Sequence, residues 1–531
     1  YFRVAVRTED DNARLLDALR STTGCSGRTV GGRESTPSLM VQGTSSSAGK
    51  TVLAAALCRI LLQDGYRVAP FKAQNMSLNS FVTRDGREMG RAQVLQAQAC
   101  REEPEVCMNP VLLKPTTDVG AQVIVRGKPK DNMNAEEYTR EKSRLFPVVE
   151  DCYESLAAEY DAIVLEGAGS PSEINLKEHD IVNMRMADLA DAPVLLTGDI
   201  DRGGVFASFV GTMELLDQWE RDLVRGFIVN RFRGDESLLD PALDYIQRHT
   251  GKPVLGVVPF LEDLNLPDED SVVFKSGGYE RGGGDEGGGV TLAVIDLPHI
   301  SNFTDFDPFK LEPDVELRVV GGPDELQEVD AIVIPGSKNV LADLEFLEDS
   351  GLAAAIREAG REGDVEVVGL CAGLQMLGRE ISDPHCIESD RGGRQGLDML
   401  PIGTVLAPSK TLTQVEASHR LSGLPVRGYE IHHGRTEVRD RSVEPAVIRG
   451  DETALGYRLK ERPVWGTYVH GIFDADRFRR WFIDRVRERA GLTSKGEVAA
   501  CYDLEPAIDR LAGVVRERLD LNKLYNFMGL A

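Results

Sequence analysis

The segment at residues 38–55, SLMVQGTSSSAGKTVLAA, constrains the fold more than any other part of the chain. A short apolar run enters a loop rich in glycine, serine and threonine. The loop ends at Gly49-Lys50-Thr51, and an alanine- and leucine-rich segment follows. This order predicts a buried strand, a phosphate-binding loop and a helix, because N–H groups at a helix N-terminus bind anions. The lysine would add positive charge, and the threonine hydroxyl would bind Mg²⁺.

The loop departs from the common spacing G-x-x-x-x-G-K-[ST]. Gly43 lies one residue too early, and Thr44 stands where the first glycine is expected. The alternative interpretation is a GKT tripeptide that falls by chance in a surface loop. The strand before the loop and the helix after it favour a nucleotide site. We therefore expect Gly43, Thr44, Gly49, Lys50 and Thr51 to surround phosphate groups.

Composition narrows the class of protein. The 531 residues suffice for two or three domains. A net charge of −25 disfavours nucleic-acid binding, and no apolar run approaches the roughly 20 residues of a membrane-spanning helix. The eight cysteines show no pairing rhythm, which favours a reduced interior. We expect a cytoplasmic protein whose partners are small molecules rather than nucleic acid or membrane.

Shifts in composition divide the chain into five segments. Residues 1–37 resemble the terminal strand and helix of aminotransferase-fold enzymes followed by a linker, and we predict the remnant of a fused domain there. We predict an α/β domain at 38–275, a glycine-rich linker at 276–289 and a second α/β domain at 290–480. Residues 481–531 have the spacing of amphipathic helices, which we expect to pack against the second domain.

Apolar runs alternate with helical patterns in the first domain, which predicts a mostly parallel sheet covered by helices. The predicted strands lie at residues 39–42, 68–71, 162–165, 193–196, 226–229 and 254–258. Ligands bind at the C-terminal ends of the strands in such sheets. The candidate site residues are therefore the polar ones that follow these strands: Lys72, Gln74, Asn75, Ser77, Asn79, Glu166, Asp201, Arg202 and Asn230.

Three of these features have a specific interpretation. Glu166 ends a buried run, where a carboxylate is costly unless it is paired or binds a metal, and it could share Mg²⁺ with Thr51. Asn230 could read the edge of a nucleotide base. The carboxamides and hydroxyls at residues 72–80 are denser than helix capping requires, which indicates a polar ligand.

The second domain contains a candidate nucleophile. We predict strands at residues 290–295, 331–334 and 365–370, and the last runs into G-x-C-x-G around Cys371. Small residues two positions before and after a nucleophile allow a sharp turn between strand and helix. The helix end favours a thiolate, and the N–H of Ala372 could stabilise an oxyanion. The alternative interpretation is a buried structural cysteine.

A cysteine nucleophile needs a base. His470 follows an apolar, aromatic strand and precedes a glycine, so we predict that it is the base. His432 and His433 are more typical of a rim or substrate loop, and any of the three could be an ordinary surface histidine.

The combination of a deviant phosphate loop and a cysteine elbow resembles the cobyric acid synthase family over roughly residues 38–530. The first domain is similar to dethiobiotin synthetases, which share the G-x5-G-K-[ST] loop. The segments that carry the resemblance lie at residues 41–51, 70–80, 85–93 (DGREMGRAQ), 109–115 (NPVLLKP), 166–176 (EGAGSPSEINL), 198–204, 230–235, 297–307 (LPHISNFTDFD), 335–339 (PGSKN), the Cys371 elbow and 466–474.

The resemblance implies a P-loop NTPase-like domain followed by a flavodoxin-like class I glutamine amidotransferase domain. It implies amidation of the b, d, e and g carboxylates of adenosylcobyrinic acid a,c-diamide with ATP, Mg²⁺ and L-glutamine. Lys50 and Lys72 would offset phosphate charge. Gln74, Asn75, Ser77, Asn79, Asp201 and Arg202 would face the corrin, and Gly336 and Ala372 would form the oxyanion hole.

The sequence also departs from the family pattern in two places. The elbow reads C-A-G-L where C-G-G-Y is common in the family. His470 lacks the His-x-Glu pattern of other class I glutaminases, so no third member of a triad is predicted.

Two rival functions stay open. The nearest rival is the sibling a,c-diamide synthase, whose K-x-G-P-D-Y-I-D-like stretch is absent. A MinD/ParA-like regulatory ATPase would leave the cysteine elbow unexplained.

Overall fold

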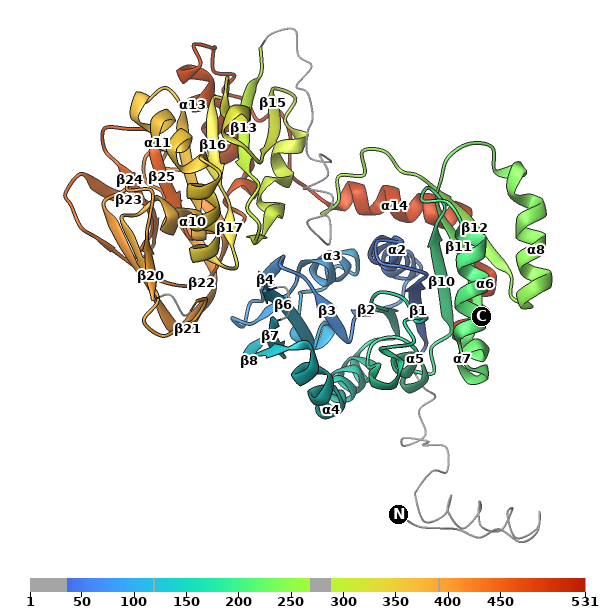
Figure 1. Ribbon diagram of the computed structural model, residues 1–531. Helices are drawn as coiled ribbons and strands as arrows, with labels where there is room; N and C mark the ends of the chain where they lie inside the picture. The colour runs from blue at the N-terminus through green and yellow to red at the C-terminus, as the bar shows by residue number, and fades with distance from the viewer. Residues whose placement is uncertain (1–35, 118–119, 268–287, 390–391, 531) are drawn as a thin grey trace, which may run out of the picture.

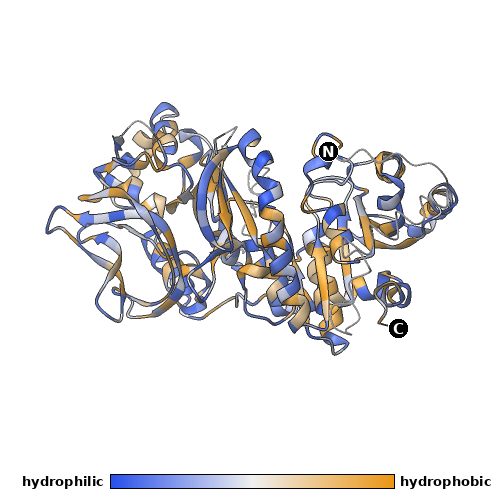
Figure 2. Ribbon diagram, turned by 90° about the horizontal axis from the view of Figure 1, so that it is seen from below, coloured by the Kyte–Doolittle hydropathy of each residue, from blue (hydrophilic) through white to orange (hydrophobic). Residues whose placement is uncertain are grey.

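The computed structural model describes residues 36–117, 120–267, 288–389 and 392–530, which form two α/β lobes side by side (Figure 1). The predicted extension at 1–37 lies outside these residues except for its last two, and so does the predicted linker at 276–289 except for its last two. In both lobes, apolar residues gather in the central strands and on the inner helix faces (Figure 2). None of the described helices is long and apolar enough to cross a membrane.

The first lobe is built on a six-stranded sheet in the order β12-β11-β10-β1-β9-β2, and every neighbouring pair is parallel. Its central strands are buried on both faces, which explains their continuous apolar sequences. All six predicted strands are confirmed. Their bounds are β1 Ser38–Gly43, β2 Val68–Phe71, β9 Ala162–Glu166, β10 Val194–Asp199, β11 Val224–Phe232 and β12 Val254–Pro259.

Helices cover this sheet, and a second, smaller sheet that the sequence did not predict adjoins it. The helices are α2 Lys50–Gln63, α3 Arg91–Ala99, α4 Ala135–Glu159, α5 Met184–Leu189, α6 Val205–Leu215, α7 Gln218–Leu223 and α8 Asp240–Thr250. The small sheet has the order β3-β6-β7-β8, and β4 pairs with β5 beside it. These strands are β3 Gln74–Met76, β4 Ser80–Val82, β5 Glu88–Gly90, β6 Val111–Thr117, β7 Gly120–Val125 and β8 Lys128–Asn134.

The second lobe contains a long sheet with a parallel half and a largely antiparallel half. The parallel strands lie in the order β15-β13-β16-β18-β25, the 2-1-3-4-5 order of flavodoxin-like folds, which confirms the predicted class. Strands β24, β23, β21, β22, β19 and β20 extend it. The bounds are β13 Val290–Ile295, β15 Val315–Val320, β16 Ala331–Ile334, β18 Glu366–Leu370, β19 Glu380–Ser382, β20 Gly393–Gln395, β21 Ile402–His419, β22 Pro425–Val438, β23 Val443–Arg449, β24 Ala454–Leu459 and β25 Val464–Thr467.

Four helices and a short pair of antiparallel strands complete the second lobe. They are α10 Val340–Asp349, α11 Leu352–Glu362, α12 Ala372–Leu377, α13 Asp476–Arg489 and the pair β14 Ile300–Ser301 and β17 Gly336–Ser337. Two 3₁₀ segments, η4 Phe303–Leu311 and η6 Ile472–Asp474, contact each other.

The prediction for the C-terminal tail is wrong for its last two helices. Helix α13 packs on the second lobe, but α14 Glu505–Arg518 and α15 Leu521–Met528 share a core with the first lobe. Arg59 of α2 pairs with Glu505 at 2.8 Å and with Asp509 at 2.7 Å, and Figure 1 shows α14 beside α2. An amphipathic pattern predicts that one helix face is buried, but it does not identify the surface that covers it.

Candidate active sites

The phosphate-loop segment has the predicted strand–loop–helix form. Strand β1 ends at Gly43 and α2 begins at Lys50, directly after Gly49 in the left-handed region at φ +94°. A Cβ atom at Gly49 would lie 2.0 Å from the Asn230 side chain, so only glycine fits there. The N–H of Thr44 donates to Thr197 O of β10 at 2.9 Å, which fixes the loop to the sheet.

The side chains around this loop support it in two ways. Lys50 Nζ donates to Ser45 O at 2.9 Å and to Gly169 O at 3.1 Å, so the ammonium group bridges the loop and the segment after β9. Asn230 donates to Ala48 O at 3.0 Å. Asn230 thus supports the loop in this structure, and its recognition of a base stays a prediction.

Glu166 is the centre of a buried polar group at the end of β9. It accepts hydrogen bonds from Thr51 Oγ1 at 2.7 Å, Lys72 Nζ at 2.9 Å and Gln96 Nε2 at 2.6 Å. These partners offset the cost of burying its charge. A carboxylate beside a hydroxyl at the first turn of a phosphate-loop helix is the oxygen donor set that Mg²⁺ prefers, so Thr51 and Glu166 fit the predicted metal.

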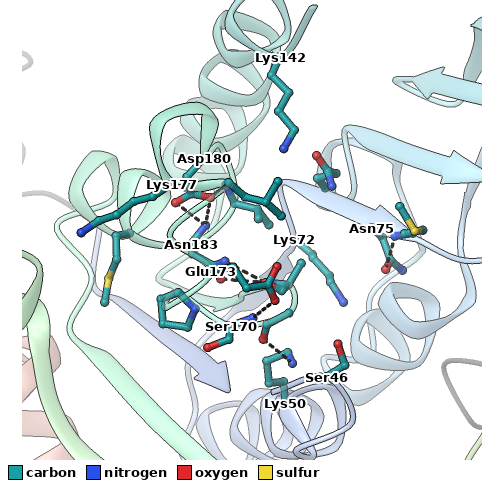
Figure 3. A pocket seen from close by; sticks show the side chains of 18 of the residues that line it. Ser46, Lys50, Lys72, Asn75, Lys142, Ser170, Glu173, Lys177, Asp180 and Asn183 are labelled. Carbon is teal, nitrogen blue, oxygen red and sulfur yellow. Dashed lines mark hydrogen bonds between the residues drawn. The ribbon is translucent and has the colours of Figure 1, made fainter. Parts of the chain in front are cut away.

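A cavity of about 360 Å³ opens beside these residues in the first lobe (Figure 3). Lys50 of α2, Lys72 of the segment after β2 and Lys142 of α4 point toward it. Gln74 and Asn75 line its wall. Of the other predicted corrin contacts, Ser77, Asn79, Asp201 and Arg202 do not line the cavity. Ser77 and Asn79 are buried in the segment after β3, whereas Asp201 and Arg202 lie exposed after β10.

The second lobe carries the predicted elbow between β18 and α12. Cys371 has φ +52°, a strained value for a residue other than glycine, and its N–H donates to Thr467 O at 2.7 Å. A Cβ atom at Gly369 would lie 2.5 Å from Gly373, and one at Gly373 would lie 2.0 Å from Ile334 O. Both glycines are therefore required by close packing, as G-x-C-x-G predicted.

His470 lies beside Cys371 and is held by a residue that the sequence pattern did not reveal. His470 Nδ1 and Asp305 Oδ2 are 2.7 Å apart, and the N–H of Gly471 donates to Asp305 Oδ1 at 2.8 Å. Burial lowers the pKa of His470, but the charges and hydrogen bonds of Asp305 and Cys371 outweigh it and raise the pKa to about 10. The arrangement favours an imidazolium ion beside the Cys371 sulfur.

Asp305 lies in the LPHISNFTDFD segment that carries the family resemblance, but its partner His470 lies 165 residues away in the sequence. The other two histidines are engaged elsewhere. His432 contacts Gly434 O at 3.0 Å and Glu430 at 3.2 Å, and His433 Nδ1 contacts Ala407 O at 2.9 Å.

The predicted oxyanion groups flank this pair. Ala372 is the first residue of α12, where an N–H has no acceptor within the helix. Gly336 lies close to the histidine, and a Cβ atom there would be 3.1 Å from His470 Cε1 and from Ser301 Oγ. The glycine therefore allows the close approach of strand β17 to the histidine.

Comparisons with known proteins assign a domain family to each of the two lobes. Residues 291–478 match the CobB/CobQ-like glutamine amidotransferase domain, and residues 39–273 match the CobQ/CobB/MinD/ParA nucleotide binding domain. The cobyric acid synthase of Nitratidesulfovibrio vulgaris (strain Hildenborough) is 52% identical over 93% of this chain and 98% of its own length. This chain belongs to the cobyric acid synthase family. It is therefore an amidating ligase with a nucleotide-binding domain and a glutamine amidotransferase domain.

Two further relatives extend the comparison. The cobyric acid synthase of Desulfitobacterium hafniense (strain DCB-2) is 49% identical over 94% of this chain and 99% of its own length. The adenosylcobalamin biosynthesis bifunctional protein CobDQ of Leptospira interrogans is 48% identical over all of this chain and 61% of its own length. The origin of residues 1–37 stays a prediction.

Proposed function

We propose that this protein uses ATP and L-glutamine to amidate the b, d, e and g carboxylates of adenosylcobyrinic acid a,c-diamide, giving adenosylcobyric acid. The observation that carries the proposal is the identity of about half with cobyric acid synthases across both lobes. The geometry of the two candidate sites supports a division of labour, in which the first lobe activates the carboxylate and the second supplies ammonia.

In the first lobe, a corrin carboxylate oxygen would attack the γ-phosphorus of ATP, forming an acyl phosphate and releasing ADP. Ammonia would then attack the acyl carbon, and phosphate would leave. Lys50 and Lys72 would offset the negative charge on the transferred phosphoryl group. Thr51 and Glu166 would hold Mg²⁺, which when bound neutralises phosphate charge.

The lining of the cavity suits a substrate with polar edges. Its wall carries the carboxamides of Gln74 and Asn75, and Lys142 points toward it from α4. Met76 and Leu176 line the same cavity with exposed apolar side chains. Apolar surface beside cations and carboxamides suits a macrocycle edged with carboxylates.

In the second lobe, the Cys371 thiolate would attack the glutamine carboxamide carbon. The N–H groups of Ala372 and Gly336 would stabilise the tetrahedral oxyanion. The His470 imidazolium would give its proton to the departing ammonia, leaving a glutamyl thioester that water hydrolyses to glutamate. Asp305 would hold His470 in the orientation that this transfer requires.

Mass spectrometry of the corrinoid tests this proposal. The enzyme is incubated with adenosylcobyrinic acid a,c-diamide, ATP, Mg²⁺ and glutamine, and we expect a stepwise gain of four amides. A parallel reaction contains the unamidated corrinoid. Two amides added there, with no change to the diamide, would move the protein to the sibling a,c-diamide synthase reaction. No mass change with either corrinoid would contradict the substrate assignment.

A further inference from the structure

The backbone carbonyl of Ser80 joins the two lobes at a buried point. Ser80 begins β4 of the first lobe, directly after the polar segment whose Gln74 and Asn75 line the cavity. Its oxygen accepts hydrogen bonds from Tyr429 Oη at 2.9 Å and from Asn302 Nδ2 at 2.8 Å, both in the second lobe. Asn302 Nδ2 also donates to Tyr429 Oη at 2.8 Å. All three residues are buried.

Tyr429 connects this point to His470. The two residues exchange backbone hydrogen bonds, with N···O distances of 3.1 Å and 2.9 Å, and their rings stack with centroids 5.5 Å apart. A Cβ atom at the preceding residue, Gly428, would lie 2.0 Å from His470 O, so the two segments are as close as backbones allow. A shift of Tyr429 would therefore move His470.

Asn302 connects the same point to Asp305. Asn302 is the residue before η4, with φ +55°, and its carbonyl accepts a hydrogen bond from the N–H of Asp305 at 3.0 Å. Both members of the His470–Asp305 pair thus have a neighbour that is bonded to the Ser80 carbonyl.

Loss of these hydrogen bonds is costly, because the junction is buried and water cannot replace the missing partners. A carbonyl that loses its donors inside a protein therefore destabilises the structure. Burial raises the pKa of the Tyr429 hydroxyl well above its usual value, so the group stays a neutral donor. The junction therefore resists separation of Ser80 from Tyr429 and Asn302 and transmits displacement of one lobe to the other.

We infer that Tyr429 and Asn302 are positioning residues that couple glutamine hydrolysis to the state of the acceptor site, through the Ser80 carbonyl. This inference rests on the proposed function, because the ligands whose binding moves the segment before Ser80 are ATP and the corrinoid. Occupation of the cavity adjusts Ser80, and Tyr429 and Asn302 then set His470 and Asp305 against Cys371.

The experiment measures glutamate formation by the full chain with and without ATP, Mg²⁺ and adenosylcobyrinic acid a,c-diamide, beside amide formation. We expect the substrates to accelerate glutamine hydrolysis in the wild type, and Tyr429→Phe to lose about fivefold or more of this acceleration. Amidation with ammonium chloride in place of glutamine should stay within about twofold of wild type, because the hydroxyl does not touch the first-lobe cavity. A purely structural role would lower both reactions together.

Tyr457→Phe is the matched control. This substitution also removes a tyrosine hydroxyl from the second lobe. Within the described part of the chain, no hydrogen bond of the Tyr457 hydroxyl is found, in contrast to that of Tyr429. Asn302→Gly is the second variant, because glycine tolerates φ +55° while the donor is removed. Full acceleration in both Tyr429→Phe and Asn302→Gly would overturn the inference, and so would a wild type whose amidation proceeds without accelerated hydrolysis. A wild type that adds no amide with either nitrogen donor would instead contradict the proposed function.

Discussion

At the scale of single residues, Asp305 contributes most to the raised pKa of His470 and so to the positive charge of that side chain. The pKa of His470 is raised from 6.5 to about 10, so the imidazole of the folded protein keeps its proton through the neutral range. A raised pKa stabilises the folded state fully below 6.5, and this contribution is lost as the pH rises through about 10. The same proton is the one that the departing ammonia would receive.

Replacement of Asp305 tests this assignment. Asp305→Asn removes the charge that contributes most to raising the His470 pKa, so the alkaline limb of kcat/KM for glutamine should move from near pH 10 toward the ordinary histidine value. The kcat/KM value itself should fall by on the order of 10²-fold or more, the usual contribution of general acid–base catalysis. Stopped assays of glutamate across about pH 6–11 measure both. Asp484→Asn on α13 is the control, and an unchanged alkaline limb in Asp305→Asn would contradict the role.

The residues of this site differ in how far the sequence could predict them. The glycines around Cys371 mark a sharp turn within five residues, so local sequence was enough to predict the elbow. Asp305 could not be predicted in the same way, because nothing in η4 indicates that its carboxylate meets His470 of a distant segment. Asn230 shows the same limit, since its position after a strand was predicted but its bond to Ala48 O was not.

At the scale of elements, the buried parallel strands were the easiest to predict from the sequence. Exposed strands, and the packing of helices whose partner is distant in the sequence, were the hardest. Strands β1 and β9 are continuous apolar runs because helices cover both faces of their sheet. Strand β8 reads KPKDNMN and is mostly exposed, so no apolar alternation predicted it. Helix α14 was predicted as amphipathic, but its partner α2 precedes it by more than 440 residues.

A pair of substitutions in α14 tests where that helix packs. Leu511 is buried against the first lobe, so Leu511→Ala should lower the free energy of unfolding of that lobe by about 2–4 kcal/mol. Gly513 lies in the same helix, and a Cβ atom there would meet no other atom within 4 Å. Gly513→Ala should therefore raise the free energy of unfolding by about 0.5–1 kcal/mol.

Urea unfolding followed by fluorescence measures both effects. Glutamine hydrolysis by Leu511→Ala, assayed without denaturant, should stay within about twofold of wild type, because the second lobe holds Cys371 and His470. A loss of hydrolysis at unchanged stability of the first lobe would show that α14 supports the second lobe instead.

At the scale of the whole molecule, the two lobes are joined by buried contacts near the second candidate site. Glu88 of the first lobe pairs with Lys410 of the second at 2.6 Å and with Lys114 at 2.9 Å. Burial raises the pKa of Glu88, but the two lysines outweigh it and hold the pKa below its usual value. Helix α14 returns from the second lobe to the first, so the lobes are tied at two places. This arrangement suits an ammonia donor and an acceptor that must work together.

Amidation of adenosylcobyrinic acid a,c-diamide by Cys371→Ala, supplied with either glutamine or ammonium chloride, separates the roles of the two lobes. Cys386→Ala is the matched control, because Cys386 has φ +51°, close to the φ +52° of Cys371. We predict that Cys371→Ala adds no amides with glutamine and four with ammonium chloride, while Cys386→Ala adds four with either. Amidation by Cys371→Ala with glutamine at the wild-type rate would show that Cys371 is not the nucleophile that releases ammonia.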